Sequence, residues 1–250
     1  MRDFAPLAAW QVLSDTSLVS QRWLEVREQR VRLANGHEID RFHLIQGPNW
    51  ASVLCLTRER EVVLVRQYRH GLGGPSLELP AGVLDANETP IEGARRELRE
   101  ESGFEVESLE PLLMVSPEPA RNATRAHFFF ARDAVRVSEL TLDSSEELEV
   151  LLVPVPEVLE LIDRGQIVHA AHIGAILLAW RRGLLAQAGE CGLKLARQGR
   201  FASDVTGSAD QRNRRAMQEA AVQTVPVFEI SVRGEISETG VSEHRVPHSE

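Results

Sequence analysis

Three glutamates lie close together within the stretch GVLDANETPIEGARRELREESGF, which runs from Gly82 to Phe104. Glu97, Glu100 and Glu101 are spaced i, i+3 and i+4, a pattern that places their carboxylates on one face of a helix. Like charges at this spacing repel and destabilise a helix by about 0.2–0.5 kcal/mol per pair. A divalent cation removes the repulsion, because hard ions such as Mg²⁺ prefer oxygen ligands and pair with phosphate groups. The spacing therefore predicts metal-assisted chemistry on a phosphate-containing substrate.

The elements that must position these carboxylates are a helix and the loop before it. Ile91, Ala94 and Leu98 fall on one helical stripe, with charged residues elsewhere. Pro90 suits the first turn of this helix, and Gly103 stands where the helix should stop. The sequence thus predicts a helix that carries all three glutamates and ends directly after them.

Strand-like segments on both sides of this helix predict an α/β fold. Residues 22–45 alternate apolar and polar side chains around Asn35 and Gly36, which indicates two strands joined by a hairpin. Other segments are rich in β-branched or apolar residues and predict further strands, namely WASVLCLT, EVVLVRQYRH, LELPAGV, HFFFARD and LEVLLVPV. GLGGPS is predicted to be a loop between two of them. Two more helices, each ended by a glycine, are predicted at PEVLELIDRG and HAAHIGAILLAWRRG.

The chain divides into three predicted regions. Residues 1–48 form a small N-terminal antiparallel β subdomain, residues 49–185 the main domain, and residues 186–250 a C-terminal extension. The secondary-structure signal weakens in the extension, where a helix is predicted at 208–223 and a strand at 225–234. The polar end of the chain resembles a disordered tail.

The overall composition is typical of a globular protein, with 250 residues, 43% hydrophobic and 26% charged. The net charge of -9 argues against broad attraction to a nucleic acid backbone. No apolar run approaches the roughly 18 residues of a membrane-spanning helix, and the N-terminus has no secretory signal pattern. The cysteines, Cys55 and Cys191, form no CxxC motif, which favours a reducing cytoplasm.

The glutamate-bearing stretch resembles the Nudix box, whose pattern is G-x5-E-x7-R-E-U-x-E-E-x-G-U, with U a bulky apolar residue. Every defined position matches, at Gly82, Glu88, Arg96, Glu97, Leu98, Glu100, Glu101, Gly103 and Phe104. The resemblance implies an α/β/α sandwich with a mixed sheet, in which a loop, a helix and a second loop carry the box. It also implies hydrolysis of a nucleoside diphosphate linked to another moiety.

The same resemblance implies roles for individual residues. The box glutamates would hold Mg²⁺ or Mn²⁺, with Glu101 as the best single candidate. Arg96 would orient a carboxylate, either Glu88 or Glu100. In this family a backbone carbonyl just before the box glycine is a further metal ligand, which here points to Ala81. The implied metal ligands are Ala81, Glu97, Glu100 and Glu101.

Features outside the box resemble the ADP-ribose pyrophosphatase branch of the family. They are VRQYRHG and LELPAG before the box and Pro117 after it. In that branch the N-terminal strands form a small sheet used for dimer exchange, so a homodimer is expected. The branch often has a glycine after the proline, where this chain has Glu118. This departure leaves the sugar end of the substrate open.

Four side chains outside the box are candidate substrate contacts. Arg69 lies nearer the following loop than Arg66 and is the better phosphate or ribose contact, the alternative being a surface cation. Glu78 would assist the metal or the substrate, or else be a simple edge-strand carboxylate. Arg121, like Arg125 nearby, would reach phosphate or serve surface solubility.

The general base is expected in the acidic loop LDSSEELEV, because the branch places such a loop before a late strand. Glu146 and Glu147 are therefore candidates for the base or for an additional metal ligand. The alternative is an exposed acidic loop, with a box glutamate acting as the base. His169 and His172 are spaced i, i+3, but two ligands are fewer than zinc sites use. Helix packing or a surface position is expected for this pair.

These observations predict a Mg²⁺-dependent Nudix pyrophosphatase that acts on a small-molecule nucleotide sugar. The expected reaction is hydrolysis of ADP-ribose or a relative, which would give AMP and ribose 5-phosphate from ADP-ribose itself. One alternative is a Nudix hydrolase for another compound, such as GDP-mannose, a dinucleotide cofactor or a diadenosine polyphosphate. A second alternative is a Nudix-fold protein that senses a nucleotide sugar without cleaving it.

Overall fold

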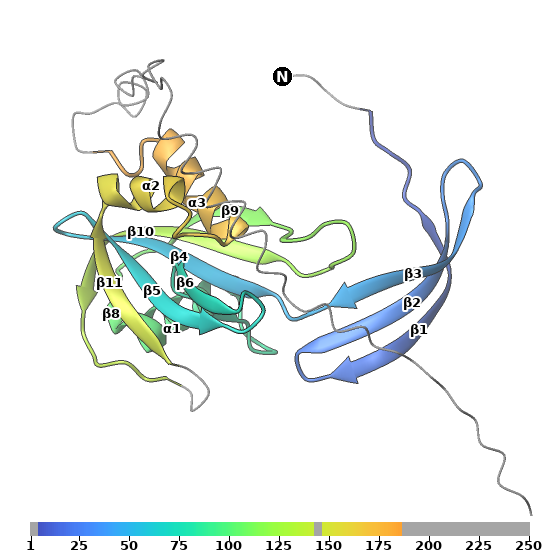
Figure 1. Ribbon diagram of the computed structural model, residues 1–250, viewed down its shortest axis with the longest axis horizontal. Helices are drawn as coiled ribbons and strands as arrows, with labels where there is room; N and C mark the ends of the chain where they lie inside the picture. The colour runs from blue at the N-terminus through green and yellow to red at the C-terminus, as the bar shows by residue number, and fades with distance from the viewer. Residues whose placement is uncertain (1–4, 143–146, 187–250) are drawn as a thin grey trace, which may run out of the picture. The chain divides into compact units, whose positions relative to one another are not determined.

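The computed structural model describes residues 5–142 and 147–186 (Figure 1). Its elements, in chain order, are β1 (Gln11–Gln21), β2 (Leu24–Arg32), β3 (Glu38–Gln46), β4 (Trp50–Thr57), β5 (Glu61–Arg69), β6 (Gly74–Glu78), β7 (Ala81–Val83), α1 (Pro90–Ser102), β8 (Phe104–Glu105), β9 (Glu110–Val115), β10 (Ala126–Arg136), β11 (Leu148–Pro154), α2 (Val155–Asp163) and α3 (Ala170–Arg181). Among these helices, none has the length and apolar character needed to span a membrane. The predicted helix at 208–223 and strand at 225–234 lie outside the described residues, as does the C-terminal extension from residue 187 onward.

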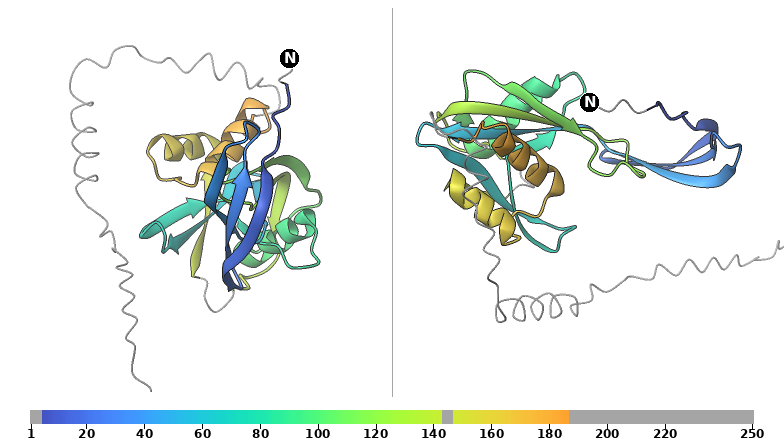
Figure 2. Two further views of the ribbon diagram at one scale, coloured as in Figure 1. Left: turned by 90° about the vertical axis from the view of Figure 1, so that its right-hand side faces the viewer. Right: turned by 90° about the horizontal axis from the view of Figure 1, so that it is seen from above.

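A mixed sheet of eight strands separates two layers of helices. Side chains of β4 alternate between these layers: Leu54 and Leu56 belong to a core with α2 and α3, whereas Val53 and Cys55 belong to a core with α1. Figures 1 and 2 show α1 on one side of the sheet and α2 with α3 on the other. The predicted α/β/α sandwich is thus confirmed.

Strand β4 lies near the centre of this sheet and gives the box loop its position. It runs parallel to β10, with Ala126 opposite Trp50. On its other side β7 pairs with the start of β4, while β5 meets β4 only near its end, at Leu56. Strand β6 pairs with β5, and β7 pairs with β4. The connection at Leu79 and Pro80 therefore crosses from the β5 side to the β4 side, where these two central strands no longer pair with each other.

Strands β1, β2 and β3 form a second, antiparallel sheet. Strands β2 and β3 are the predicted hairpin, and Gly36 at its turn has a φ of 85° that favours glycine. The sheet is joined to the main domain through Ile45, whose N–H donates to the Arg121 carbonyl at 2.8 Å and whose carbonyl accepts from the Ala123 N–H at 3.0 Å. The predicted small N-terminal antiparallel sheet is therefore present, with β1 as an additional strand.

Two local predictions were wrong in part. GLGGPS is not a loop throughout, because Gly74 begins β6 and Ser76 pairs with Gln67 of β5. Ile91 is 40% exposed, although the helical stripe assigned it to the core. It lies in the first turn of α1, and the stripe becomes buried only from Ala94 onward.

Candidate active site

Helix α1 is fixed at both ends by its own sequence. The side chain of Thr89 accepts from the Glu92 N–H, and the Glu92 carboxylate accepts from the Thr89 N–H at 2.9 Å, which forms a capping box. Gly103 adopts the left-handed conformation with a φ of 73°, and its N–H donates to the Arg99 carbonyl at 2.8 Å. A Cβ at this position would collide with the carbonyl of Ser138. The predicted helix boundaries are confirmed, and with them the register of the three glutamates.

Two of these glutamates turn toward the backbone of the box loop. Glu97 and Glu101 are only 8% and 4% exposed. The Ala81 N–H donates to Oε2 of Glu101 at 2.8 Å. A Cβ added at Gly82 would collide with the Glu97 carboxylate, so glycine alone allows this close approach. The sequence thus brings two buried carboxylates against one short stretch of backbone.

The guanidinium of Arg96 binds three carboxylates and a carbonyl. Its Nε and Nη2 donate to the two oxygens of Glu88, both at 2.9 Å, and Nη2 also donates to the Val83 carbonyl at 3.0 Å. Its Nη1 donates to Glu97 at 2.7 Å and to Glu100 at 3.0 Å. These carboxylates, Glu88 above all, raise the pKa of Arg96, and Arg96 in turn lowers the pKa of Glu88. Arg96 therefore contacts both carboxylates it was expected to orient, and Glu97 as well.

The oxygen donors of this cluster suit a hard divalent cation. The side chain of Glu100 is 39% exposed and reaches solvent at the edge of the cluster. Within residues 5–142 and 147–186, no group of three or more His, Cys, Asp or Glu side chains converges closely enough to hold a metal ion. Glu97 and Glu100 bind Arg96 instead, so a cation has to compete with that guanidinium for them.

A second arginine, Arg69, binds Glu78 through two parallel hydrogen bonds. Its Nε donates to Oε1 at 3.0 Å and its Nη2 to Oε2 at 2.7 Å. The Glu78 side chain is only 2% exposed, although β6 pairs with no strand other than β5 among the described residues. Burial opposes ionisation of Glu78, but the contact with Arg69 outweighs it and lowers the pKa of Glu78 to about 2. Glu78 is therefore a buried carboxylate that stays ionised.

A cavity of about 320 Å³ adjoins both the box loop and the Arg69–Glu78 pair. It is lined by Trp50, Arg69, Glu78, Ala81, Gly82, Val83, Pro117, Asn122, Thr124, His169 and His172. Asn122 and Thr124 were not singled out from the sequence, although they lie in the segment that departs from the ADP-ribose pyrophosphatase pattern. No local signal identifies them, because they are positioned by residues distant in the sequence: Asn122 forms a β-bridge with Ile45, and the Thr124 hydroxyl donates to the Gly47 carbonyl at 3.3 Å.

The two histidines lie in the wall of this cavity, where α3 packs on the sheet. Their rings stack with centroids 4.2 Å apart, and His172 is 1% exposed. Burial lowers the pKa of His172 to about 3 and also lowers the pKa of His169. Both imidazoles are therefore neutral near pH 7, and the helix-packing alternative for this pair is the one that the structure shows.

Comparison with known proteins agrees with this arrangement. The family model described as NUDIX domain matches residues 48–173, just over half of the 250-residue chain. The chain belongs to the Nudix family. The matched region contains the box, the cavity and both histidines.

This Nudix protein is similar in sequence to pyrophosphatases from other organisms and in fold to a solved structure. The chain is 28% identical to the ADP-ribose pyrophosphatase of Bacillus subtilis (strain 168), over 66% of this chain and 90% of that protein. It is 34% identical to the GDP-mannose pyrophosphatase of Cronobacter sakazakii, over 55% of this chain and 76% of that protein. A structure described as that of an ADP compounds hydrolase shares the fold, with a TM-score of 0.62, 23% identity, and coverage of 72% of this chain and 98% of that chain. The chain is thus a Nudix hydrolase, and Nudix ADP-ribose pyrophosphatases generally use a divalent metal ion.

Other residues predicted for the Nudix site do not line the cavity. Arg66 is exposed, and its side chain pairs with that of Glu149 at 3.3 Å. In a strand, successive side chains point to opposite faces, so Arg66 and Arg69 of β5 do not share a face. Arg121 is exposed as well, with 62% of its side chain accessible. Glu147 is exposed, and Glu146 lies outside the described residues. The structure brings Arg69 and Glu78 to the site and leaves Arg66, Arg121 and Glu147 at the surface.

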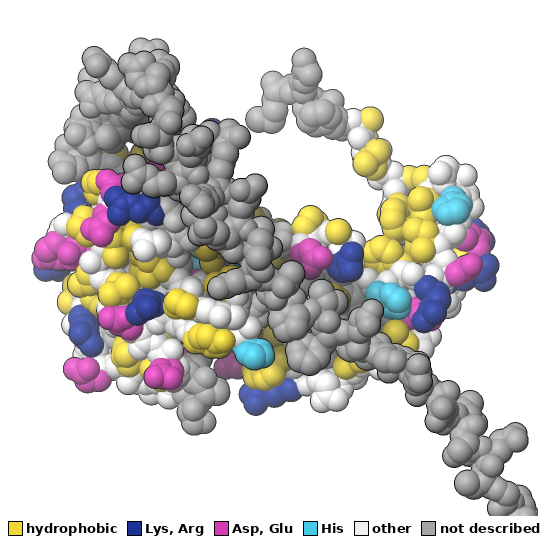
Figure 3. All heavy atoms as spheres, viewed as in Figure 1, with side chains coloured by type: hydrophobic (Ala, Val, Ile, Leu, Met, Phe, Trp, Pro, Cys, Tyr) yellow, Lys and Arg dark blue, Asp and Glu magenta, His cyan; other side chains and the backbone are white. Residues whose placement is uncertain are grey.

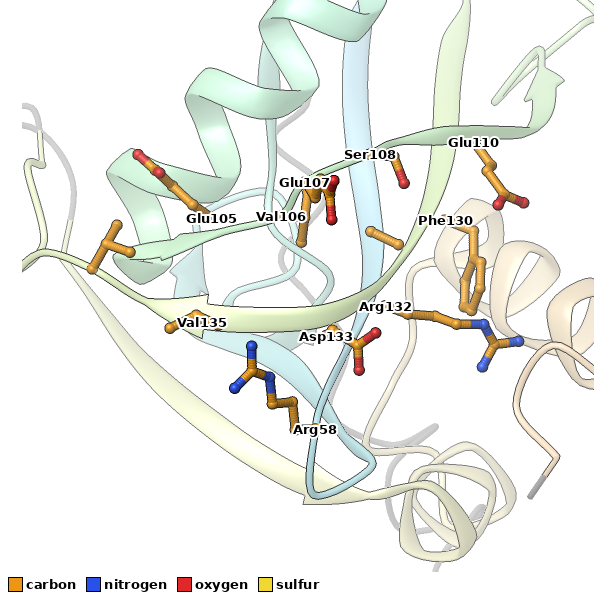
Figure 4. Close-up of a pocket in the computed structure, with 12 residues that line it drawn as sticks. Arg58, Glu105, Val106, Glu107, Ser108, Glu110, Phe130, Arg132, Asp133 and Val135 are labelled. Carbon is orange, nitrogen blue, oxygen red and sulfur yellow. The ribbon is translucent and has the colours of Figure 1, made fainter. Parts of the chain in front are cut away.

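A larger cavity of about 780 Å³ is lined by Arg58, which directly follows β4, and by residues of β8, β9 and β10 (Figure 4). Arg58 and Arg132 line it together with acidic residues of the β8–β9 segment, among them Glu107. Neither this cavity nor the smaller one is lined by a box glutamate. The smaller cavity differs in that it contacts the box loop directly, at Ala81, Gly82 and Val83, which makes it the candidate site for the chemistry of this Nudix hydrolase.

Proposed function

We propose that this Nudix hydrolase cleaves the pyrophosphate bond of ADP-ribose or a closely related nucleoside diphosphate sugar. A water would attack one phosphorus and the bridging P–O bond would break, which releases a nucleoside monophosphate and a sugar phosphate. The observation that carries the proposal is the 320 Å³ cavity, which extends from the Ala81–Val83 backbone to the Arg69 guanidinium. The relatives named ADP-ribose pyrophosphatase support this class of substrate.

Mg²⁺ is the proposed cofactor, and Mn²⁺ is the proposed substitute. The carboxylates of Glu97, Glu100 and Glu101 and the carbonyl of Ala81 would hold it. When bound, the ion would neutralise the diphosphate and lower the pKa of a bound water. The hard oxygen donors of α1 support this assignment, as does the missing side chain at Gly82 that brings Glu97 to the loop.

The other residues of the site would bind and orient. Arg96 holds Glu88, Glu97 and Glu100 in fixed directions through charge-assisted hydrogen bonds. Arg69 remains positively charged at the cavity wall, where it would contact phosphate or ribose. Much of the catalysis would then come from positioning and from electrostatic stabilisation of the developing charge.

The general base is proposed among the acidic residues already named. Glu146 and Glu147 belong to the segment before β11; Glu147 is exposed and is not among the residues that line the cavity, and Glu146 lies outside the described residues. If neither Glu146 nor Glu147 acts as the base, Glu100 or Glu101 would take the proton from the attacking water.

Product analysis tests the proposed function. The protein would be incubated with Mg²⁺ and, separately, with ADP-ribose, GDP-mannose, a dinucleotide cofactor, a diadenosine polyphosphate and a nucleoside triphosphate. We expect AMP and ribose 5-phosphate from ADP-ribose, and loss of this activity with a chelator. Faster cleavage of GDP-mannose would favour the activity named for the relative of 34% identity. Binding without cleavage of any compound would favour a sensor.

We also propose that two copies assemble through the sheet of β1–β3, in the cytoplasm that the cysteine content favours. Large hydrophobic side chains in or directly beside this sheet are exposed: Trp10, Val12, Leu18, Trp23 and Leu24 range from 42% to 56%. Figure 3 shows hydrophobic side chains gathered over the same strands. An exposed apolar surface of this kind suits contact with a second copy of the chain. Light scattering should give a dimer for the native chain and a monomer for Leu18→Asp.

A further inference from the structure

His172 makes a hydrogen bond that ties α3 to the connection between β6 and β7. Its Nδ1 accepts from the backbone N–H of Leu79 at 3.0 Å. Because a backbone amide only donates, Nδ1 carries no proton, and the neutral ring holds its proton on Nε2. The ring is fixed on several sides, with centroid distances of 5.6 Å to Trp50, 5.5 Å to Phe128 and 4.2 Å to His169.

The connection that receives this bond is held from both layers of helices. Of its residues, Leu79 donates its N–H to His172 of α3, and Ala81 donates its N–H to Glu101 of α1 at 2.8 Å. Pro80 between them has no N–H, and its carbonyl accepts from the Val53 N–H of β4 at 3.0 Å. Every N–H of Leu79–Ala81 is therefore bound by a side chain, one from each side of the sheet.

The neighbours of this connection belong to the active site. Glu78, which precedes it, is the buried partner of Arg69, and Gly82, which follows it, lies against Glu97. A shift of the Leu79 backbone would therefore move the Ala81 amide relative to Glu101. It would also move Glu78 at the cavity wall.

We propose that His172 is a positioning residue of the hydrolase, which fixes the Leu79–Gly82 backbone against the Glu101 carboxylate. It acts through the loop and need not touch the reacting atoms. The expected effect of His172 on turnover rests on the proposed function. The hydrogen bond to Leu79 and its expected effect on metal binding do not depend on which substrate the enzyme cleaves. The competing explanation is that His172 only fills space in the core between Trp50, Phe128 and α3.

Two substitutions of nearly equal shape separate these explanations. In His172→Asn the side-chain oxygen is as far from Cβ as Nδ1 is and can accept the Leu79 N–H. In His172→Leu the same branched shape has no acceptor, which leaves a buried amide without its partner. For His172→Leu we expect kcat for ADP-ribose to fall roughly tenfold, the size of one lost buried hydrogen bond, with KM changed less than about threefold. His172→Asn should retain most of kcat.

Metal binding gives a second readout that does not depend on turnover. Titration with Mn²⁺, followed by electron paramagnetic resonance, should show weaker binding to His172→Leu than to the native protein, with His172→Asn close to native. Equal kcat and equal Mn²⁺ binding in the two variants would overturn the proposal, because a space-filling role does not distinguish Asn from Leu in this way. Circular dichroism and thermal unfolding establish that both variants are folded.

The native protein itself provides a test that needs no variant. In ¹⁵N-labelled protein, a coupling across the hydrogen bond between the Leu79 nitrogen and His172 Nδ1 is expected, together with an Nε2-protonated ring. Absence of this coupling with a proton on Nδ1 would overturn the proposal. If the native protein cleaves none of the compounds above, the proposed function fails, whereas the coupling and the Mn²⁺ titration still decide the role of His172.

Discussion

The two arginine clusters of the active site differ in their charge balance. Arg96 faces three carboxylates, those of Glu88, Glu97 and Glu100. Arg69 forms a bidentate pair with the carboxylate of Glu78. The three carboxylates around Arg96 leave an excess of negative charge beside the backbone of the box loop, whereas the Arg69–Glu78 pair is matched in charge. On the proposed function, the first cluster would bind the cation and the Arg69–Glu78 pair would form a fixed wall of the site.

The clusters also differ in their access to water. The side chains of Glu88 and Glu100 are 13% and 39% exposed, whereas that of Glu78 is 2% exposed. Water can therefore screen the excess charge around Arg96, but it cannot replace Arg69 as the partner of Glu78. Substitutions in the first cluster should mainly affect turnover, and substitutions in the second should also affect folding.

The largest expected effect is that of Glu101→Gln in the first cluster. The amide keeps the shape but removes the charge that would hold a cation, so we expect kcat to fall roughly 10³-fold with the fold intact. Glu160→Gln is the matched control, because Glu160 is an exposed residue of α2 that pairs with Arg164. Near-normal turnover of Glu101→Gln would refute the metal assignment.

A smaller but still large effect is expected for Gly82→Ala. The added Cβ collides with the Glu97 carboxylate, so Glu97 has to leave its place at the loop. We expect kcat/KM to fall by roughly 10- to 100-fold, since misplacement of a functional group on this scale is costly. Gly174→Ala is the control, because nothing lies within 4 Å of its added Cβ and alanine favours a helix. Equal activity of the two variants would show that the position of Glu97 is not critical.

In the second cluster, Arg69→Met should lower stability because it leaves Glu78 buried without its cation. We expect the free energy of unfolding to fall by about 1–3 kcal/mol at pH 7, less than for a fully buried pair because Arg69 is 45% exposed. The lowered pKa of Glu78, about 2, contributes stability that is fully present above about pH 4.5 and is lost as the pH falls toward 2. The difference between native and Arg69→Met should therefore shrink between pH 4.5 and pH 2 in urea unfolding. Arg66→Met, which removes an exposed pair with Glu149, should cost less than about 1 kcal/mol.

The last expected effect is a pH dependence of stability, which arises from the titration of His172 beside the second cluster. Its pKa is lowered by burial to about 3, whereas in the unfolded chain it is near 6.5. Between about pH 6.5 and pH 3, His172 therefore binds a proton in the unfolded chain but not in the folded chain, so the free energy of unfolding falls as the pH drops below about 6.5. The slope should approach about 1.4 kcal/mol per pH unit, with Glu78, Arg69 and His169 as the charged or titratable neighbours.

Urea unfolding between pH 7.5 and pH 5 measures this slope. The His172→Asn variant should show a shallower dependence, with only the smaller contribution of His169 remaining at this site. Identical slopes for the native protein and the variant would mean that His172 is protonated in the fold, contrary to its hydrogen bond with Leu79.

The fold was predictable where the signal is local and regular. Buried strands such as β4 and β5 are continuous apolar runs, and α1 has its cap, proline and glycine in sequence order. Strand β1 was missed because its pairing with β2 shifts register between Val12 and Ser14 and between Ser17 and Val19. These irregularities break the period of two on which strand recognition depends.

The active site was predictable only in part, for the same reason. The i, i+3, i+4 spacing is a local geometry, so the common face of the glutamates follows from the helix alone. The burial of Glu78 does not follow from its neighbours, because it depends on the pairing of β6 with β5 and on the reach of Arg69. Arg66 and Arg121 are arginines like Arg69, and the sequence alone gives no reason to exclude them as substrate contacts. Only the fold shows that Arg69 lines the cavity whereas the other two do not.

The sequence by itself determined the family, the α/β/α layering and the helix that carries the carboxylates, because these features arise from patterns within short segments. Tertiary structure decided which side chains meet across long distances in sequence. It set Arg96 among three carboxylates, buried Glu78 under Arg69, and brought His172 to the amide of Leu79. The physical reason is that hydrogen-bond partners, burial and cavities depend on the packing of strands and helices that are distant along the chain.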